Sequence, residues 1–139
     1  MIPLDEIHPL LIHFPIALFG LVFLFDVLSL FMKDERFEFA SFWTLLLAVA
    51  SSFVAIITGI IADQLEGHMD EPWRIFETHG SMQIVSSLLF VGLMVWRIRQ
   101  KGTIPKERPL NLIYFGLCAV AVLGIYYGSH LGAMLGGRI

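Results

Sequence analysis

Charged residues are scarce in this sequence. They make up 15% of the 139 residues, whereas 57% are hydrophobic. Soluble domains carry roughly a quarter charged residues, so a water-soluble globular protein is excluded. The formal net charge of −3 offers no basic surface for nucleic acid, and we expect no nucleic-acid partner. The only cysteine, Cys118, excludes an internal disulfide, and its position in an apolar run predicts a small buried side chain.

Long apolar runs are abundant. Four of them can cross a hydrocarbon core ~30 Å thick, which takes about 20 helical residues. In lipid they must be helical, because an exposed backbone amide finds no partner there. The runs cover about residues 10–32, 40–62, 75–97 and 110–136. Because short links join them, we predict an all-α integral membrane four-helix bundle with antiparallel neighbours and a single transmembrane domain over residues 1–139.

The basic residues indicate how the bundle is oriented. The first and third links contain Lys33, Arg36, Arg97, Arg99, Lys101, Lys106 and Arg108, whereas the other polar segments contain only Arg74 and Arg138. The positive-inside rule then places these two links in the cytoplasm and both termini on the periplasmic side of a bacterial inner membrane. Residues 1–12 contain no Lys or Arg, so we expect no cleaved signal peptide.

This topology collects all five histidines at the periplasmic face. His13, His79 and His130 lie near the outer ends of three different spans, each within about two helical turns of the boundary. His8 and His68 share that face, and for His8 we favour an interfacial residue that caps a helix end over a ligand. Ionisable residues within a membrane are costly and are therefore candidates for function. We predict that His13, His79 and His130 converge in one shallow pocket.

Asp26 is the one carboxylate placed deep in the first span. A carboxylate in lipid must be paired, hydrogen-bonded or protonated. We expect it to make a structural hydrogen bond between helices, with Trp43 and Thr44 as the candidate partners. The alternative is a step on a proton path, to which His8 and Gln83 are also candidate contributors, either there or as supports for a bound ligand.

Small and polar residues follow faces of the other spans. In the third span, His79, Gln83, Ser86 and Ser87 form a polar stripe that should face the bundle interior. The second span carries small residues that permit close packing or make room for a porphyrin, and these are Thr44, Ala48, Ser51, Ser52, Ala55, Thr58, Gly59 and Ala62. In the fourth span, glycines at four-residue spacing form a close-approach face suited to another helix, a second copy of the chain or the flat face of a macrocycle. We favour a homodimer contact through this row, which comprises Gly124, Gly128, Gly132 and Gly136, with Gly116 on the same line.

Several of these residues form a recognisable pattern. It comprises His8-Pro9, His13-Phe14-Pro15, Asp26, Thr58-Gly59 followed by Asp63, His79 and a glycine-rich end around His130. The pattern resembles the small bacterial membrane proteins grouped as domain of unknown function 2231, over nearly the whole chain. The resemblance implies a four-span membrane protein. Association of some relatives with c-type cytochrome modules implies respiratory redox chemistry. The end of this chain, residues 132–137, departs from the longer tail of the family.

The leading functional hypothesis is a haem-b-binding subunit of respiratory electron transfer. Two imidazoles from facing helices at one depth can hold a haem within a bundle. His13 and His79 are the predicted axial pair, with His130 as the alternative partner. A periplasmic c-type cytochrome or a quinone would exchange electrons with the haem. An electron-transfer or accessory subunit is favoured over an enzyme.

Two other functions remain open. His13, His79, His130 and Asp63 provide donors for a divalent or copper ion, since imidazole suits zinc, copper and iron. Asp63 would otherwise orient an imidazole from behind. The second alternative is a cofactor-free assembly or structural subunit of a membrane complex, whose histidines take part in hydrogen bonds between helices.

Overall fold

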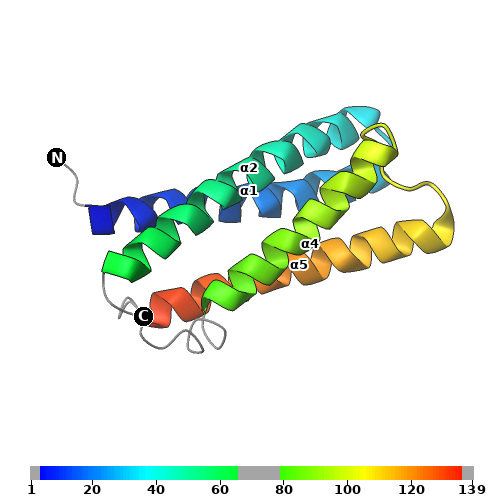
Figure 1. Ribbon diagram of the computed structural model, residues 1–139. Helices are drawn as coiled ribbons and strands as arrows, with labels where there is room; N and C mark the ends of the chain where they lie inside the picture. The colour runs from blue at the N-terminus through cyan, green and yellow to red at the C-terminus, as the bar shows by residue number, and fades with distance from the viewer. Residues whose placement is uncertain (1–3, 66–78, 136–139) are drawn as a thin grey trace.

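The computed structural model describes residues 4–65 and 79–135, and these segments form four helices (Figure 1). In chain order the helices are α1 Leu4–Met32, α2 Glu35–Leu65, α4 His79–Arg99 and α5 Arg108–Leu135. Each contains a stretch long and apolar enough to cross a membrane. The predicted all-helical fold with four candidate spans is therefore confirmed for the described residues.

The connection between α1 and α2 is much shorter than predicted. A link over 33–39 was expected, but α2 begins at Glu35. Lys33 ends α1 in a left-handed conformation with φ 51°. Asp34 then caps α2, because its Oδ1 accepts a 2.9 Å hydrogen bond from the Arg36 backbone N–H. This two-residue turn brings α1 and α2 directly side by side.

The four helices form two hairpins. α1 packs mainly on α2, and α4 packs mainly on α5, with lesser contacts of α2 with α4 and of α1 with α5. In Figure 1 the start of α1 and the end of α5 lie at one end of the bundle, called the terminal end below. The Lys33–Asp34 turn and the connection over residues 100–107 lie at the other, called the loop end.

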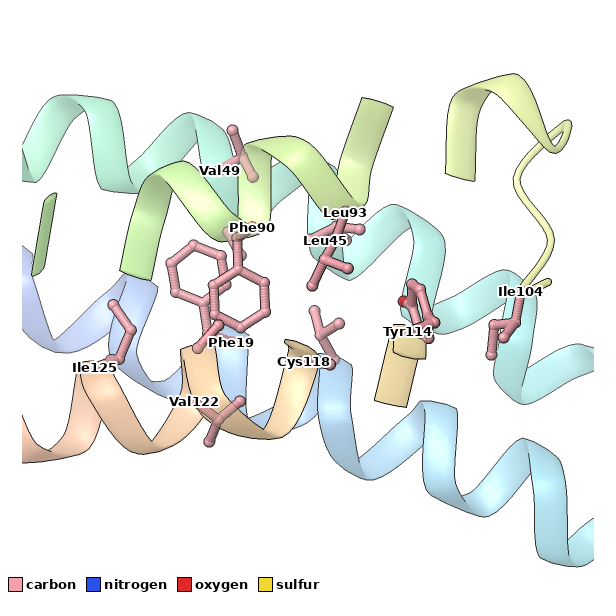
Figure 2. Close-up of a cluster of buried hydrophobic side chains, with 13 residues drawn as sticks. Phe19, Leu45, Val49, Phe90, Leu93, Ile104, Tyr114, Cys118, Val122 and Ile125 are labelled. Carbon is pink, nitrogen blue, oxygen red and sulfur yellow. The ribbon is translucent and has the colours of Figure 1, made fainter. Parts of the chain in front are cut away.

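Aromatic stacking fills the centre between the hairpins. The rings of Phe19 in α1 and Phe90 in α4 stack with centroids 3.9 Å apart, and both side chains are fully buried (Figure 2). Leu45 of α2 and Ile125 of α5 belong to the same buried cluster. Protein side chains therefore occupy the middle of the bundle, and the small buried residue Ala48 of α2 packs into this core.

The glycine row of α5 is partly used within the chain. A Cβ atom at Gly124 would overlap the Ser86 Oγ of α4. Gly128 is buried as well, whereas a Cβ at Gly116 would meet nothing within 4 Å. His130 is exposed on a different side of the helix. At Gly124 the row therefore contacts α4 of the same chain, and this position is closed to a second copy.

Candidate functional site

A buried ion pair joins the two hairpins near the loop end. The Asp26 carboxylate of α1 and the Arg97 guanidinium of α4 are fully buried, with Oδ1 and an Nη atom 3.1 Å apart. Tyr114 of α5 donates its hydroxyl hydrogen to the other Asp26 oxygen at 2.7 Å. Arg97 also donates to Ser41 Oγ of α2 at 2.9 Å. All four helices therefore contribute to one polar cluster inside the bundle.

The Arg97 guanidinium is saturated with hydrogen bonds. Besides Asp26 and Ser41, it donates to the carbonyl oxygen of Gly102 at 3.2 and 2.9 Å and to that of Glu38 at 2.8 Å. These bonds use all five N–H groups that an arginine carries. We call this group the Arg97 cluster, and it comprises Asp26, Glu38, Ser41, Arg97, Gly102 and Tyr114. A charged pair in lipid is tolerated only when its hydrogen bonds are satisfied as completely as they are here. Because its members come from both hairpins, the cluster holds the hairpins together.

Asp26 does make hydrogen bonds between helices, but the expected partners were wrong. The Thr44 hydroxyl donates to the Ala40 carbonyl of its own helix at 2.7 Å, and the Trp43 ring is exposed. Arg97 had been counted as a loop charge because it begins the basic run Arg97, Arg99 and Lys101. The signal that was missed is a base at the same end as an intramembrane acid, since such groups pair in lipid.

The polar stripe of α4 faces the interior, as predicted for its described side chains. Ser86 and Ser87 are buried. Gln83 donates from Nε2 to the Ile125 carbonyl at 3.2 Å and to Ser129 Oγ at 3.0 Å. Gln83 thus connects α4 with α5 on the terminal-end side of the Phe19–Phe90 stack, and its amide nitrogen donates to protein acceptors.

Two of the predicted histidine ligands have described side chains. His13 in α1 and His130 in α5 are both exposed. Neither makes a hydrogen bond or ion pair with any residue in segments 4–65 and 79–135. α4 begins at His79, but the side chain of His79 lies outside the described part of the structure. The side chains of His8 in α1 and Asp63 in α2 also lie outside it, as does His68 altogether.

His13 and His130 follow the same line of contact between α1 and α5. A Cβ atom at Gly20 would overlap the Tyr126 hydroxyl, so these two residues mark where the helices face each other. At 100° per residue, His13 lies about 20° around α1 from Gly20. His130 lies about 40° around α5 from Tyr126. Both histidines therefore extend the same contact line, which we call the α1–α5 seam (His13, Gly20, Tyr126 and His130).

Their depths along the seam also agree. With a rise of 1.5 Å per residue, His13 lies about 10 Å from Gly20 toward the terminal end. His130 lies about 6 Å beyond Tyr126 in the same direction. The tyrosine ring spans much of the remaining difference because its hydroxyl, not its Cα, touches Gly20. Ideal helix geometry therefore predicts similar depths for His13 and His130, on the side where α1 and α5 face each other.

The described residues contain no group of three or more His, Cys, Asp or Glu side chains that could hold a metal ion. Two crevices, of about 230 and 250 Å³, are found at the loop end, far from His13 and His130. At the seam, the imidazoles of His13 and His130 are both exposed.

These features define a helical membrane protein of two hairpins with a charge-paired loop end. The chain matches the family described as "Predicted membrane protein (DUF2231)" over residues 4–138, and it belongs to this family. The resemblance drawn from the histidine-proline motifs is thereby confirmed. No curated protein and no solved structure matches the chain.

Proposed function

We propose that the protein is an inner-membrane haem-b-binding protein of respiratory electron transfer, with the haem at the terminal end. The observation that supports this proposal is the close approach of Gly20 and Tyr126, from which helix geometry carries the exposed His13 and His130 toward the same side of the bundle. Haem iron is commonly held by imidazole nitrogens from two helices, and it supplies a reversible one-electron change. The exposed state of both rings favours a haem at the lateral surface, with one edge toward lipid.

The seam favours His13 with His130 as the axial pair. His130 was the alternative partner to His79, and the pairing of His13 with His79 stays a prediction. The positions of the histidines along their helices support His130 over His79 as the partner of His13. His79 lies about 16 Å along α4 from Phe90, while His13 lies only about 9 Å along α1 from Phe19, which stacks on Phe90. His79 therefore sits farther toward the terminal end than His13.

Two donors are enough for a haem but not for a bare metal ion. Protein sites for zinc take three or four side-chain ligands. Among the described residues the seam supplies two. A site for a divalent or copper ion would also need His79 and Asp63, and this remains the alternative to haem.

The distribution of charge supports a periplasmic terminal end. Arg97 must be removed from the count of loop charges because it is buried and paired. The exposed basic residues left at the loop end are Lys33, Arg36, Arg99, Lys101, Lys106 and Arg108. The positive-inside rule then assigns the loop end to the cytoplasm. A seam open to lipid and close to the periplasm suits a quinone or a periplasmic c-type cytochrome as the electron partner.

An absorption spectrum of the purified protein, produced with ample haem, tests the proposal. We expect a Soret band and an α band on reduction, both abolished by His13→Ala and by His130→Ala. His68→Ala is the matched control, since it removes a histidine outside the seam, and it should retain both bands. Protein without a Soret band would refute haem binding, and elemental analysis would then distinguish a bare metal ion from a cofactor-free subunit.

A further inference from the structure

The larger crevice at the loop end lies where α1, α2 and the α4–α5 connection meet. Its volume is about 250 Å³, against ~30 Å³ for one water in the liquid, so it admits a small polar group. The residues that line it are Leu30, Glu38, Ile104, Pro105, Lys106 and Asn111. Three of the four helices and the connection between α4 and α5 therefore shape one surface depression.

The crevice carries one charge of each sign. Lys106 is exposed and forms no ion pair with another described residue. The Glu38 carboxylate accepts a hydrogen bond from the Ile104 backbone N–H through one oxygen. Its second oxygen has no partner among the described residues. An ammonium donor and a carboxylate acceptor are thus both available to a group that enters from outside.

The crevice also lies at the boundary of the apolar spans. The span of α1 ends at Met32 and that of α2 starts at Glu35, so Leu30 and Glu38 lie close to the edge of the hydrocarbon. Leu30 is 48% exposed, and it borders the polar crevice directly. The polar crevice and the apolar Leu30 side chain therefore lie next to each other at the depth where phospholipid headgroups meet their acyl chains.

We propose that this crevice binds the headgroup of phosphatidylethanolamine from the adjoining leaflet. The lipid phosphate accepts hydrogen bonds from the Lys106 ammonium, and the ethanolamine ammonium donates to the free oxygen of Glu38. An acyl chain then runs along Leu30. This binding is independent of the haem proposal, because the crevice and the seam lie at opposite ends of the bundle.

The charge pattern selects this lipid over two common alternatives. Phosphatidylcholine carries a quaternary ammonium with no N–H, so it cannot donate to Glu38. Phosphatidylglycerol has no cation at all and would bring a hydroxyl-bearing headgroup against a carboxylate. Phosphatidylethanolamine alone of the three offers both an acceptor for Lys106 and a charged donor for Glu38.

A neighbouring crevice provides an internal comparison. It measures about 230 Å³ and shares Lys106, but its carboxylate is Glu107. Glu107→Gln therefore removes the same charge from the adjacent crevice and leaves Glu38 unchanged. Glu38→Gln keeps an oxygen that accepts from the Ile104 N–H, so the loop stays anchored while the charge disappears. Arg99→Ala removes an exposed positive charge at the same end without lining either crevice.

The test is native mass spectrometry of the protein in nanodiscs with equal parts of the three lipids. We expect preferential retention of phosphatidylethanolamine. Lys106→Ala should reduce retention about tenfold, the effect of losing one charge-assisted hydrogen bond. Glu38→Gln should abolish the preference over phosphatidylglycerol, whereas Glu107→Gln and Arg99→Ala should leave it intact. Circular dichroism of each variant verifies that the helices remain folded.

Three results would overturn the assignment. They are equal retention of the three lipids, a preference that survives both Lys106→Ala and Glu38→Gln, and a preference removed by Glu107→Gln but not by Glu38→Gln. Displacement of the bound lipid by an equal concentration of soluble phosphoethanolamine would also contradict it, since a lipid site gains affinity from the acyl chain along Leu30.

Discussion

Arg97 illustrates how a membrane protein accommodates a full charge. Its guanidinium is 0% exposed, and yet it donates hydrogen bonds to side chains on three helices and to two backbone carbonyls. The Phe42 ring adds a cation–π contact, with the guanidinium carbon 5.5 Å from its centroid. Removing one partner of this ion pair costs more stability than replacing both partners with apolar residues, because the remaining partner stays buried and charged.

Asp26→Ala should therefore destabilise the protein by about 3 kcal/mol or more, because it leaves Arg97 without a counter-ion in lipid. Unfolding by steric trapping or by graded SDS would measure the change. The double variant Asp26→Leu with Arg97→Met should recover much of the loss, since apolar side chains replace both charges. A double variant less stable than Asp26→Ala would contradict this explanation, because the ion pair itself would then stabilise the fold beyond the cost of leaving Arg97 unpaired.

At the α1–α2 turn, acid should weaken the cap of α2. The hydrogen bonds from the Arg36 side chain, and then from its backbone N–H, lower the pKa of Asp34 below its ordinary value of 3.8. A depressed pKa gives stability that is present above the unfolded pKa and is lost as the pH falls through the folded pKa. Below about pH 4 the melting temperature should therefore decrease as the pH falls. Asp34→Asn should reduce this pH dependence of the melting temperature. An NMR titration that finds the pKa of Asp34 at or above its ordinary value would rule this out.

At the scale of elements, α4 and α5 depend on the close approach at Gly124. Gly124→Ala forces a methyl group onto Ser86 Oγ, whereas Gly116→Ala meets open space. Both changes gain helix propensity equally. Gly124→Ala should therefore be less stable than Gly116→Ala by about 1–3 kcal/mol, the usual cost of overpacking.

Ser86→Ala provides the rescue for that prediction. It removes the Oγ atom with which the added methyl group collides, while the Ser86 Cβ stays 3.5 Å away. Thermal denaturation in detergent should show the double variant Gly124→Ala with Ser86→Ala close to Ser86→Ala alone. Equal stability of Gly124→Ala and Gly116→Ala would mean that α4 and α5 do not meet at this point.

The helices could be predicted from the sequence because long apolar runs allow no other structure in lipid. The predicted first span, 10–32, ends at the residue where α1 ends. The Lys33–Asp34 turn could not be predicted, because the charged residues Glu35, Arg36 and Glu38 resemble a link until Asp34 is seen to cap α2. The Arg97 cluster was missed for a similar reason. Pairing of Asp26 with Arg97 depends on how two distant helices are set side by side, which hydrophobic patterning does not encode.

For the whole molecule, the two ends differ in chemistry. The loop end has a saturated ionic cluster and exposed cations, and the terminal end has imidazoles without described partners. The proposed topology is tested by cysteine labelling. In a Cys118→Ala background, Arg99→Cys should react with a membrane-impermeant maleimide only after the inner membrane is opened. Labelling from the periplasm in intact cells would reverse the topology.

The most direct test of the account compares Soret absorbance in His130→Ala and Tyr114→Phe. Tyr114→Phe removes the hydroxyl that donates to Asp26 and accepts from Arg97 in the Arg97 cluster at the loop end, and His130→Ala removes an imidazole from the seam. We predict that Tyr114→Phe lowers the melting temperature but retains the Soret band, whereas His130→Ala loses the band in a protein that remains folded. An undiminished Soret band in His130→Ala, or no band in the unaltered protein, would contradict the central claim.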